Sequence, residues 1–388
     1  MTFREAEEYL LSLELFGMRF GLDRMHRLMT VLGLPQRRFG SIHVVGTNGK
    51  SSTVRFCAAI LERHGLRTGS YTSPHLGSFR ERIEVGEEPV SEADFAAAVE
   101  RAAQAAELVN RTEDDPVTQF EALTAAAYHE LARRGVEVAV IEAGLGGRFD
   151  ATNVIPSKVQ ALTSVGLEHT RWLGPTVADI AAEKLAVVPE GGRLVVSEPE
   201  WASLVPQAGE VVVVRAEGTY QDQNRAVARA AVELALGRGV DPAAMAGVRV
   251  PGRMEVRGSE PLEVWDGAHN PDGMARLVAE LPALLDGRAP RVAVLSTLGE
   301  KDVAGMARLL SGVCDVIVAT QSTNPRVLPA AELAAVAGGE AEPDPVRARE
   351  RAIELAGSRG AVIVCGSLYL LHDLITRSPG AEAARSPA

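Results

Sequence analysis

The sequence predicts an α/β fold with two domains, each built around a parallel sheet. Short and nearly continuous runs of apolar, β-branched residues recur along the 388 residues, and stretches rich in Ala, Leu, Glu and Arg at helical period separate many of them. Continuous apolar runs are typical of strands buried on both faces, and alternation of strand with helix is typical of parallel sheets. The pattern starts afresh near residue 251, which predicts a domain boundary there.

The larger first domain is predicted to span residues 1–250 and the smaller second domain residues 251–388. In the first domain, the expected strands are 42–45, 138–141, 159–165, 194–197 and 211–214, and the expected helices include 53–64, 91–108, 120–134 and 224–236. The second domain is expected to be a doubly wound, Rossmann-like unit with strands at 262–265, 292–295, 316–319 and 361–365. The tail 377–388, rich in Ser, Pro, Ala and Gly, is expected to fray.

Charge and composition exclude several classes of protein. The formal net charge of −11 argues against a protein that coats nucleic acid or an anionic membrane, since both need a basic surface. No apolar run approaches about 18 residues, and the acidic N-terminus lacks a signal-peptide core. Three widely spaced cysteines indicate free thiols in a reducing compartment. We therefore expect a cytoplasmic protein.

Lysine is rare in this chain. It occurs only at positions 50, 158, 184 and 301, and the other 36 of the 40 basic residues are arginine. Each lysine could therefore mark a position that needs a compact charge or an amine able to lose its proton. The alternative explanation is a GC-rich genome that favours arginine throughout.

The strongest local signal is the sequence GTNGKSS at residues 46–52, between a predicted strand and a predicted helix. In a phosphate-binding loop, glycines let backbone N–H groups turn inward, the helix N-terminus adds positive potential, the lysine reaches the terminal phosphates and a hydroxyl can face Mg²⁺. The usual spacing would put the first glycine at position 44, which is Val44, so this loop is shorter than the common form. The alternative is a plain strand-to-helix turn capped by Ser51.

Other segments of the first domain have the composition of ligand-binding turns. The sequence EAGLGGRFDATN at 142–153 follows a predicted strand, and its three glycines in four residues permit close approach of the backbone to a ligand. Thr118 and Glu121 have the spacing of a capping box, so the Glu121 carboxylate either caps a helix or binds a metal ion. The sequence TSPH at 72–75 is by itself most simply a turn after a strand.

His169 and Lys184 are further candidates in the first domain. His169 follows the predicted strand 159–165 and is either a Mg²⁺ ligand or a hydrogen-bonded loop residue. Lys184 lies among apolar residues of a predicted helix, and burial lowers the pKa of a lysine. A neutral amine can react with CO₂ to give a carbamate, an anionic oxygen ligand for hard cations. The alternative for Lys184 is a surface lysine whose stem lies along apolar neighbours.

Glycine and polar side chains follow three predicted strands of the second domain. The sequences are DGAHNP at 266–271, TLGEKD at 297–302 and GSLY at 366–369, and PGRME at 251–255 opens the domain. The carboxyl ends of parallel strands meet at one edge of a sheet, where α/β proteins bind ligands. We therefore expect these segments to face the cleft between the two domains.

Together these motifs resemble the folylpolyglutamate synthase/dihydrofolate synthase family, a branch of the Mur ligase superfamily. The resemblance covers about residues 11–371, and its motifs are FGMRFGL at 16–22, GTNGKS at 46–51, SPHL at 73–76, ERI at 81–83, FE at 120–121, GLGGRFDATN at 144–153, EH at 168–169, LG at 173–174, EK at 183–184, PGR at 251–253, DGAHNP at 266–271 and GSLY at 366–369. The short phosphate loop is the form found in that superfamily. The chain departs from the family pattern at Tyr220, where His is usual, at 185–186, where Ala-Gly is usual, and at Glu300, where Asp is more common.

The resemblance implies a P-loop ATPase domain at the N-terminus, with ATP and two Mg²⁺ ions as cofactors. It implies that the ATP-binding residues are Thr47, Asn48, Gly49, Lys50, Ser51, Ser52, Asn224, Arg253, Asp266 and His269. It implies that the metal ligands are Ser51, Ser73, Glu121, His169 and Lys184 in its carbamate form. Catalytic roles then fall to Lys50, Glu121, His169 and Lys184.

The resemblance also implies a reaction in two steps. A carboxylate of a pterin-type substrate attacks the γ-phosphate of ATP to form an acyl phosphate, and the amine of L-glutamate then displaces phosphate to form an amide. Closure of the interdomain cleft would exclude water from the intermediate. The expected partners are small molecules (pterin or folate, L-glutamate and ATP), without nucleic acid or membrane, and the expected state is a monomer. Two alternatives are a Mur-type ligase for another acid, such as a cell-wall precursor, and a nucleotide-binding regulator without ligase activity.

Overall fold

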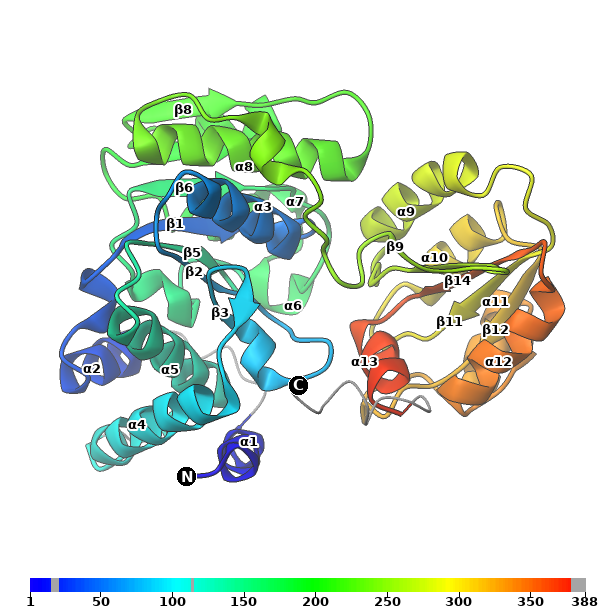
Figure 1. The fold of residues 1–388 in the computed structure, drawn as a ribbon, viewed down its shortest axis with the longest axis horizontal. Helices are drawn as coiled ribbons and strands as arrows, with labels where there is room; N and C mark the ends of the chain where they lie inside the picture. The colour runs from blue at the N-terminus through cyan, green and yellow to red at the C-terminus, as the bar shows by residue number, and fades with distance from the viewer. Residues whose placement is uncertain (15–20, 113–114, 378–388) are drawn as a thin grey trace. The chain divides into compact units, whose positions relative to one another are not determined.

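The computed structural model describes residues 1–14, 21–112 and 115–377 and confirms the α/β fold (Figure 1). The chain divides into two compact units, Met1–Val248 and Arg249–Ala388. Most of the motif at 16–22 and nearly all of the tail at 377–388 lie outside the described residues, so those two expectations are not tested.

The first unit contains an eight-stranded sheet with the order β4-β3-β2-β5-β1-β6-β7-β8. Its strands are β1 (Gly40–Val45), β2 (Thr68–Tyr71), β3 (Ile83–Val85), β4 (Glu88–Pro89), β5 (Val138–Glu142), β6 (Val159–Leu162), β7 (Arg193–Val196) and β8 (Glu210–Val213). Neighbouring strands pair in parallel along β2-β5-β1-β6-β7-β8. Strands β3 and β4 extend the sheet beyond β2 with antiparallel pairing. The predicted strand 159–165 is therefore too long, because β6 ends at Leu162 and the next residues turn toward the loop after β1.

The helices of the first unit cover both faces of this sheet. They are α1 (Phe3–Ser12), α2 (Asp23–Val31), α3 (Lys50–Arg63), α4 (Glu92–Asn110), α5 (Gln119–Arg133), α6 (Thr170–Leu173), α7 (Val177–Leu185) and α8 (Tyr220–Leu236). Short 3₁₀ helices are η1 (Pro35–Arg37), η2 (Phe79–Arg82), η3 (Ala151–Val154), η4 (Pro199–Leu204) and η5 (Pro242–Met245). Helices α3 and α8 lie side by side on one face, and α4 and α5 pack together on the other (Figure 1).

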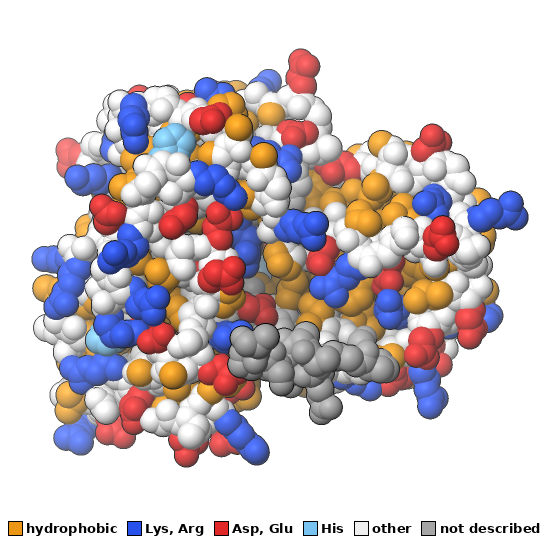
Figure 2. Space-filling model, in the orientation of Figure 1, with side chains coloured by type: hydrophobic (Ala, Val, Ile, Leu, Met, Phe, Trp, Pro, Cys, Tyr) orange, Lys and Arg blue, Asp and Glu red, His pale blue; other side chains and the backbone are white. Residues whose placement is uncertain are grey.

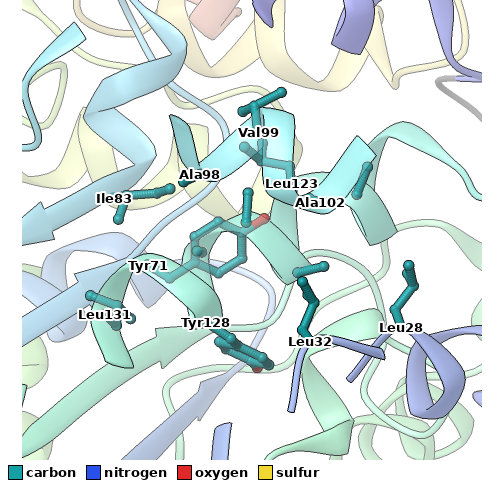
Figure 3. Packing of buried hydrophobic residues seen from close by; sticks show 14 of the residues in the cluster. Leu28, Leu32, Tyr71, Ile83, Ala98, Val99, Ala102, Leu123, Tyr128 and Leu131 are labelled. Carbon is teal, nitrogen blue, oxygen red and sulfur yellow. The ribbon is translucent and has the colours of Figure 1, made fainter. Parts of the chain in front are cut away.

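A large core cluster lies between α4, α5 and the sheet (Figure 3). Tyr71 and Tyr128 are fully buried in it, and each hydroxyl finds a partner, as buried tyrosines require. The Tyr71 hydroxyl meets Thr124 Oγ1 at 3.2 Å, and the Tyr128 hydroxyl donates to the Thr152 carbonyl at 2.8 Å. The second contact ties the core to the segment 142–153 that follows β5.

The second unit contains a six-stranded sheet with the order β13-β12-β11-β14-β10-β9, parallel except for β9. Its strands are β9 (Glu255–Ser259), β10 (Leu262–Trp265), β11 (Arg291–Leu295), β12 (Val316–Ala319), β13 (Glu340–Ala341) and β14 (Ala361–Cys365). Its helices are α9 (Pro271–Leu284), α10 (Val303–Leu310), α11 (Ala330–Ala337), α12 (Pro345–Ala356) and α13 (Leu368–Arg377). The four predicted strands of this unit appear within one residue of their predicted bounds.

The surface and the cysteines agree with the composition. The face shown in Figure 2 carries basic and acidic side chains interspersed over both units. The three cysteines are buried and free. Within the described part of the chain, no helix is long and apolar enough to cross a membrane.

Candidate functional site

The loop at 46–49 connects β1, at the centre of the sheet, to the N-terminus of α3. Gly49 precedes the helix with φ 87, in the left-handed region that glycine adopts without strain. A Cβ at this position would lie 2.4 Å from Asn224 Oδ1 of α8, so glycine is also the residue that fits. The first N–H groups of α3 have no partner within the helix and give its N-terminus a positive potential, which is the physical basis of phosphate binding there.

Lys50 and Ser51 are the first residues of α3. Lys50 contacts the loop itself, and Ser51 contacts the neighbouring strand β5. The Lys50 ammonium donates to the carbonyl oxygens of Gly46, at 3.1 Å, and Thr47, at 3.2 Å. The Ser51 hydroxyl donates to Glu142 Oε1 at 3.0 Å. Both side chains therefore lie at the loop, as the sequence predicted.

Glu142 is the carboxylate that faces the loop, and sequence reasoning did not single it out. It is the last residue of β5, beside β1, and is 1% exposed. Its second oxygen accepts the Ser73 N–H at 3.2 Å, so Ser51 and Ser73 meet at one carboxylate. The available signal was its position, because a carboxylate at the carboxyl end of a central parallel strand lies at the ligand-binding edge of the sheet.

In the structure Glu121 takes the capping role, one of the two roles that its sequence context left open. Its carboxylate accepts the N–H and the hydroxyl of Thr118 at 2.9 and 3.0 Å, which completes the capping box of α5. Arg24 also pairs with it at 3.0 Å. Of the two roles that the sequence left open for Glu121, the geometry favours the cap, and Glu142 takes its place beside Ser51 and Ser73.

Lys184 lies at the end of α7 but reaches the phosphate loop. Its side chain is 5% exposed, and the amine donates to the Gly46 carbonyl at 2.8 Å. Burial and then the nearby Lys50 ammonium lower the pKa of Lys184 to about 7, against the opposing effect of three carboxylates. A large fraction of this amine is therefore neutral near pH 7, which is the form that reacts with CO₂.

The glycine-rich segment after β5 lies against the backbone of α7. A Cβ at Gly147 would lie 2.5 Å from the Lys184 carbonyl oxygen, so only glycine permits this approach. Asp150 holds the segment by accepting the N–H groups of Leu145 at 2.7 Å and Thr152 at 3.0 Å. Burial raises the pKa of Asp150, and these hydrogen bonds oppose that shift. The glycines thus bring Lys184 to the loop.

His169 lies after β6 in a conformation that is unusual for a residue with a Cβ. Its φ is 53, in the left-handed region, and its side chain is exposed, with Nε2 4.0 Å from Glu168 Oε1. Such strain is often found at functional sites. Among the described residues, no three His, Cys, Asp or Glu side chains gather closely enough to hold a metal ion by themselves.

The N-terminal turn of α8 supports the phosphate loop from behind. Asn224 is buried against Gly49 and donates to Gln221 Oε1 at 3.2 Å. Gln221 in turn donates to the Ser52 hydroxyl at 3.3 Å. Thr47 and Asn48 are held from the opposite side, where the Thr47 N–H donates to the Ser164 carbonyl at 2.7 Å. The predicted residues Thr47 to Ser52 and Asn224 are thus brought together.

In the second unit, the residues predicted to bind nucleotide gather at the carboxyl end of β10. Asp266 is buried, and its two oxygens accept the N–H groups of Met254 and Ala268, each at 2.8 Å. The Arg253 guanidinium donates to the Gly252 carbonyl at 3.0 Å, and His269 Nδ1 lies 2.8 Å from the Gly267 carbonyl oxygen. Asp266 therefore fixes the two turns that carry Arg253 and His269.

Comparison with known proteins decides the family. Residues 252–368 match the family described as Mur ligase, glutamate ligase domain. The dihydrofolate synthase/folylpolyglutamate synthase of Mycobacterium tuberculosis is 35% identical over 400 residues, covering 87% of this chain and 82% of that protein. The chain belongs to the folylpolyglutamate synthase/dihydrofolate synthase family. The predicted family resemblance is therefore confirmed.

Solved structures of this family share the fold over nearly the whole chain. Mycobacterium tuberculosis folylpolyglutamate synthase complexed with ADP has a TM-score of 0.89 at 31% identity and covers 97% of this chain and 99% of its own. Escherichia coli FolC in complex with DHPP and ADP has a TM-score of 0.88 at 29% identity, covering 100% and 99%. A bifunctional folylpolyglutamate synthase/dihydrofolate synthase with Mn, AMPPNP and L-glutamate bound has a TM-score of 0.86 at 29% identity, covering 97% and 98%.

Proposed function

We propose that this chain is an ATP-dependent ligase that joins L-glutamate to dihydropteroate, to a reduced folate, or to both, and releases ADP and phosphate. The observation that carries the proposal is the convergence of Lys50, Glu142 and Lys184 on one phosphate loop, in a chain similar to such synthases along most of its length. Its partners are these small molecules. We further propose that it acts as a monomer in the cytoplasm.

The phosphates of ATP bind at the N-terminus of α3. There the first N–H groups of the helix and the Lys50 ammonium supply positive charge. Lys50 exchanges its contacts with the Gly46 and Thr47 carbonyls for contacts with the phosphates, which are stronger acceptors because they carry full charge. Asn224 and Ser52 lie close enough to the loop to shape it around the nucleotide.

The residues around Glu142 fit a divalent cation with hard oxygen ligands. The carboxylate of Glu142 is buried at the Ser51 hydroxyl and beside Ser73, and oxygen donors of this kind suit Mg²⁺. A carbamate on Lys184 together with His169 would hold a second ion. Bound Mg²⁺ supplies Lewis-acid polarisation of phosphoryl oxygens and neutralises their charge.

The reaction needs an activated acid, because a carboxylate is a poor electrophile. A carboxylate oxygen of the pterin substrate attacks the γ-phosphorus of ATP, the bond from this phosphorus to the bridging oxygen breaks, and ADP leaves. The α-amine of L-glutamate then attacks the acyl carbon, and phosphate leaves as the amide forms and the amine loses its proton. Lys50 neutralises part of the charge during the first step. In the second unit, Arg253 and His269 lie on the turns that Asp266 fixes, and we assign both to nucleotide binding.

We expect Glu142→Gln to raise the Mg²⁺ concentration for half-maximal activity by about tenfold or more, since the substitution removes the carboxylate charge from the cation site. Glu121→Gln is the matched control. It weakens the α5 cap and the Arg24 pair, so it lowers thermal stability by about 1 kcal/mol and leaves the Mg²⁺ requirement unchanged. Mg²⁺ titrations of the steady-state rate check both variants. A shifted requirement in Glu121→Gln alone would reverse our assignment.

The function is tested by ADP release from the purified protein with ATP, Mg²⁺ and L-glutamate. The acid is varied among dihydropteroate, tetrahydrofolate and a muramyl-peptide precursor. We expect glutamate-dependent ADP release with one or both pterin substrates. Release only with the muramyl precursor would show a Mur-type ligase for cell-wall synthesis, and nucleotide binding without turnover on any acid would show a non-catalytic regulator.

A further inference from the structure

We propose that Thr163 and Ser164 are positioning residues that hold the Asn48–Gly49 peptide in the orientation that phosphate binding requires. Both follow directly after Leu162, where β6 ends, and both are 3% exposed. The inference rests on the proposed binding of ATP at this loop and assigns to two neutral side chains a role in that binding.

Both hydroxyl groups converge on a single carbonyl oxygen. Thr163 Oγ1 donates to the Asn48 carbonyl at 2.7 Å, and Ser164 Oγ donates to the same oxygen at 3.0 Å. The Ser164 hydroxyl also accepts the Asn48 N–H at 3.1 Å. A carbonyl oxygen has two lone pairs, so these two donors saturate it. Both backbone polar groups of Asn48, its N–H and its carbonyl, are thus hydrogen-bonded to these side chains.

Fixing this carbonyl also fixes the direction of the next N–H. In a trans peptide the C=O and the following N–H point in opposite directions. The Asn48 carbonyl points to Thr163 and Ser164, which follow β6, so the Gly49 N–H points away from these two residues, at the N-terminus of α3. That is the direction in which an N–H can donate to a bound phosphate.

Without the two hydroxyls, this peptide has an alternative orientation. Glycine tolerates backbone angles on both sides of the φ map, so rotation of the Asn48–Gly49 peptide meets little steric resistance at Gly49. The rotated peptide would present the Asn48 carbonyl, with its partial negative charge, where phosphate binds. Two buried hydroxyls on one acceptor therefore select the binding-competent loop before the nucleotide arrives.

The segment just before β6 provides a matched control. Ser157, just before β6, is 7% exposed, and its hydroxyl lies at 2.9 Å from the Ser41 carbonyl and 2.8 Å from the Val159 carbonyl. It is therefore a buried serine with backbone acceptors at the opposite end of the strand from the loop. Ser157→Ala removes a comparable hydroxyl without touching residues 46–49.

The experiment measures the Kd for ADP by calorimetry and the KM values for ATP and L-glutamate. The variants are Thr163→Val, Ser164→Ala and the double variant, with Thr163→Ser and Ser164→Thr as rescues that keep the hydroxyl. We expect the double variant to weaken ADP binding and raise KM for ATP by about 10- to 100-fold, with KM for L-glutamate within about threefold of wild type. The rescues and Ser157→Ala are expected to bind ADP as wild type does. If the double variant fails to fold, the single variants are expected to show smaller losses of the same kind.

The outcomes separate this inference from the proposed function. Wild-type protein that binds neither ADP nor ATP would overturn both. Suppose that Lys50→Ala loses ADP binding while Thr163→Val, Ser164→Ala and the double variant bind ADP with wild-type affinity. That result would overturn only the positioning role. An equal loss in Ser157→Ala, or an equal rise in KM for ATP and for L-glutamate, would show that the hydroxyls merely support the fold.

Discussion

Replacing Lys184 by methionine is expected to lower kcat by about 10³-fold, because the variant cannot form the carbamate that we assign to the metal site. Lewis-acid stabilisation of phosphoryl oxygens is worth several kcal/mol, and each ~1.4 kcal/mol changes a rate tenfold. Methionine is close to lysine in length and fills the buried position between α7 and the phosphate loop. A loss of activity would therefore result from removal of the amine and not from a cavity left by a smaller side chain. The measurement is the steady-state rate at saturating ATP, L-glutamate and pterin substrate.

The carbamate has its own signature. The neutral amine adds to CO₂ and releases one proton, so wild-type enzyme depleted of CO₂ by acid treatment should lose activity and regain it with bicarbonate. Lys184→Met and Lys184→Arg should show no such response, since arginine keeps the positive charge but does not lose its proton. Electron density for a bare amine that contacts no metal, in crystals grown with ATP and Mg²⁺, would contradict the assignment.

The burial that makes Lys184 reactive also destabilises the fold at low pH. Its pKa is about 7 in the folded chain and 10.5 when unperturbed, so between these values the unfolded chain binds the additional proton. The free energy of unfolding therefore rises with pH from about 7 to about 10.5 as the destabilisation by the buried charged amine is relieved. Below pH 7 this destabilisation has its full size. In CO₂-free buffer, Lys184→Met should melt at a higher temperature than wild type at pH 6, and the difference should narrow toward pH 10. Parallel melting profiles would show that this amine is not desolvated.

The sequence predicted the parts of this site that have local signals. The loop at 46–52 combines a strand, glycines, a lysine and a helix start within a few residues, and the structure has each of them there. The scarcity of lysine pointed to Lys184, which lies 138 residues from Gly46 in sequence and contacts its carbonyl. The same scarcity pointed to Lys158, which is exposed and lies just before β6. A compositional bias thus marks candidates but does not say which of them are buried.

Other parts of the site have no local signal. The spacing of Glu121 allows a cap or a metal ligand, and the family resemblance implied the metal role. Glu142 lies at the end of an apolar strand and reaches Ser51 only because β5 lies beside β1. The apolar pattern of the sequence predicts that Thr163 and Ser164 belong to a longer strand, 159–165. Their hydroxyls reach the Asn48 carbonyl because β6 pairs with β1, the strand that leads into the phosphate loop. Contacts set by sheet order cannot be derived from the composition of one segment.

Lys50→Ala is expected to lower kcat by about 10²–10³-fold, the usual cost of removing one donor that stabilises charge in a transition state. The Lys50 ammonium lies 3.1 Å from the Gly46 carbonyl, within reach of phosphates at the start of α3. Lys158→Ala is the matched control, because this lysine is exposed and should leave kcat unchanged. A kcat of Lys50→Ala equal to that of wild type would show that Lys50 does not stabilise the transition state.

Lys50→Ala should also change the chemistry of Lys184. Both amines donate to the Gly46 carbonyl, and the positive charge of Lys50 is one cause of the lowered pKa of Lys184. Removing that charge raises the pKa of Lys184, so less of its amine is neutral at pH 7 and less carbamate forms. Bicarbonate reactivation of the residual activity should therefore need a higher pH in Lys50→Ala than in wild type. If the two reactivation profiles coincide, the lysines act independently, and the phosphate loop has no influence on how the carbamate forms.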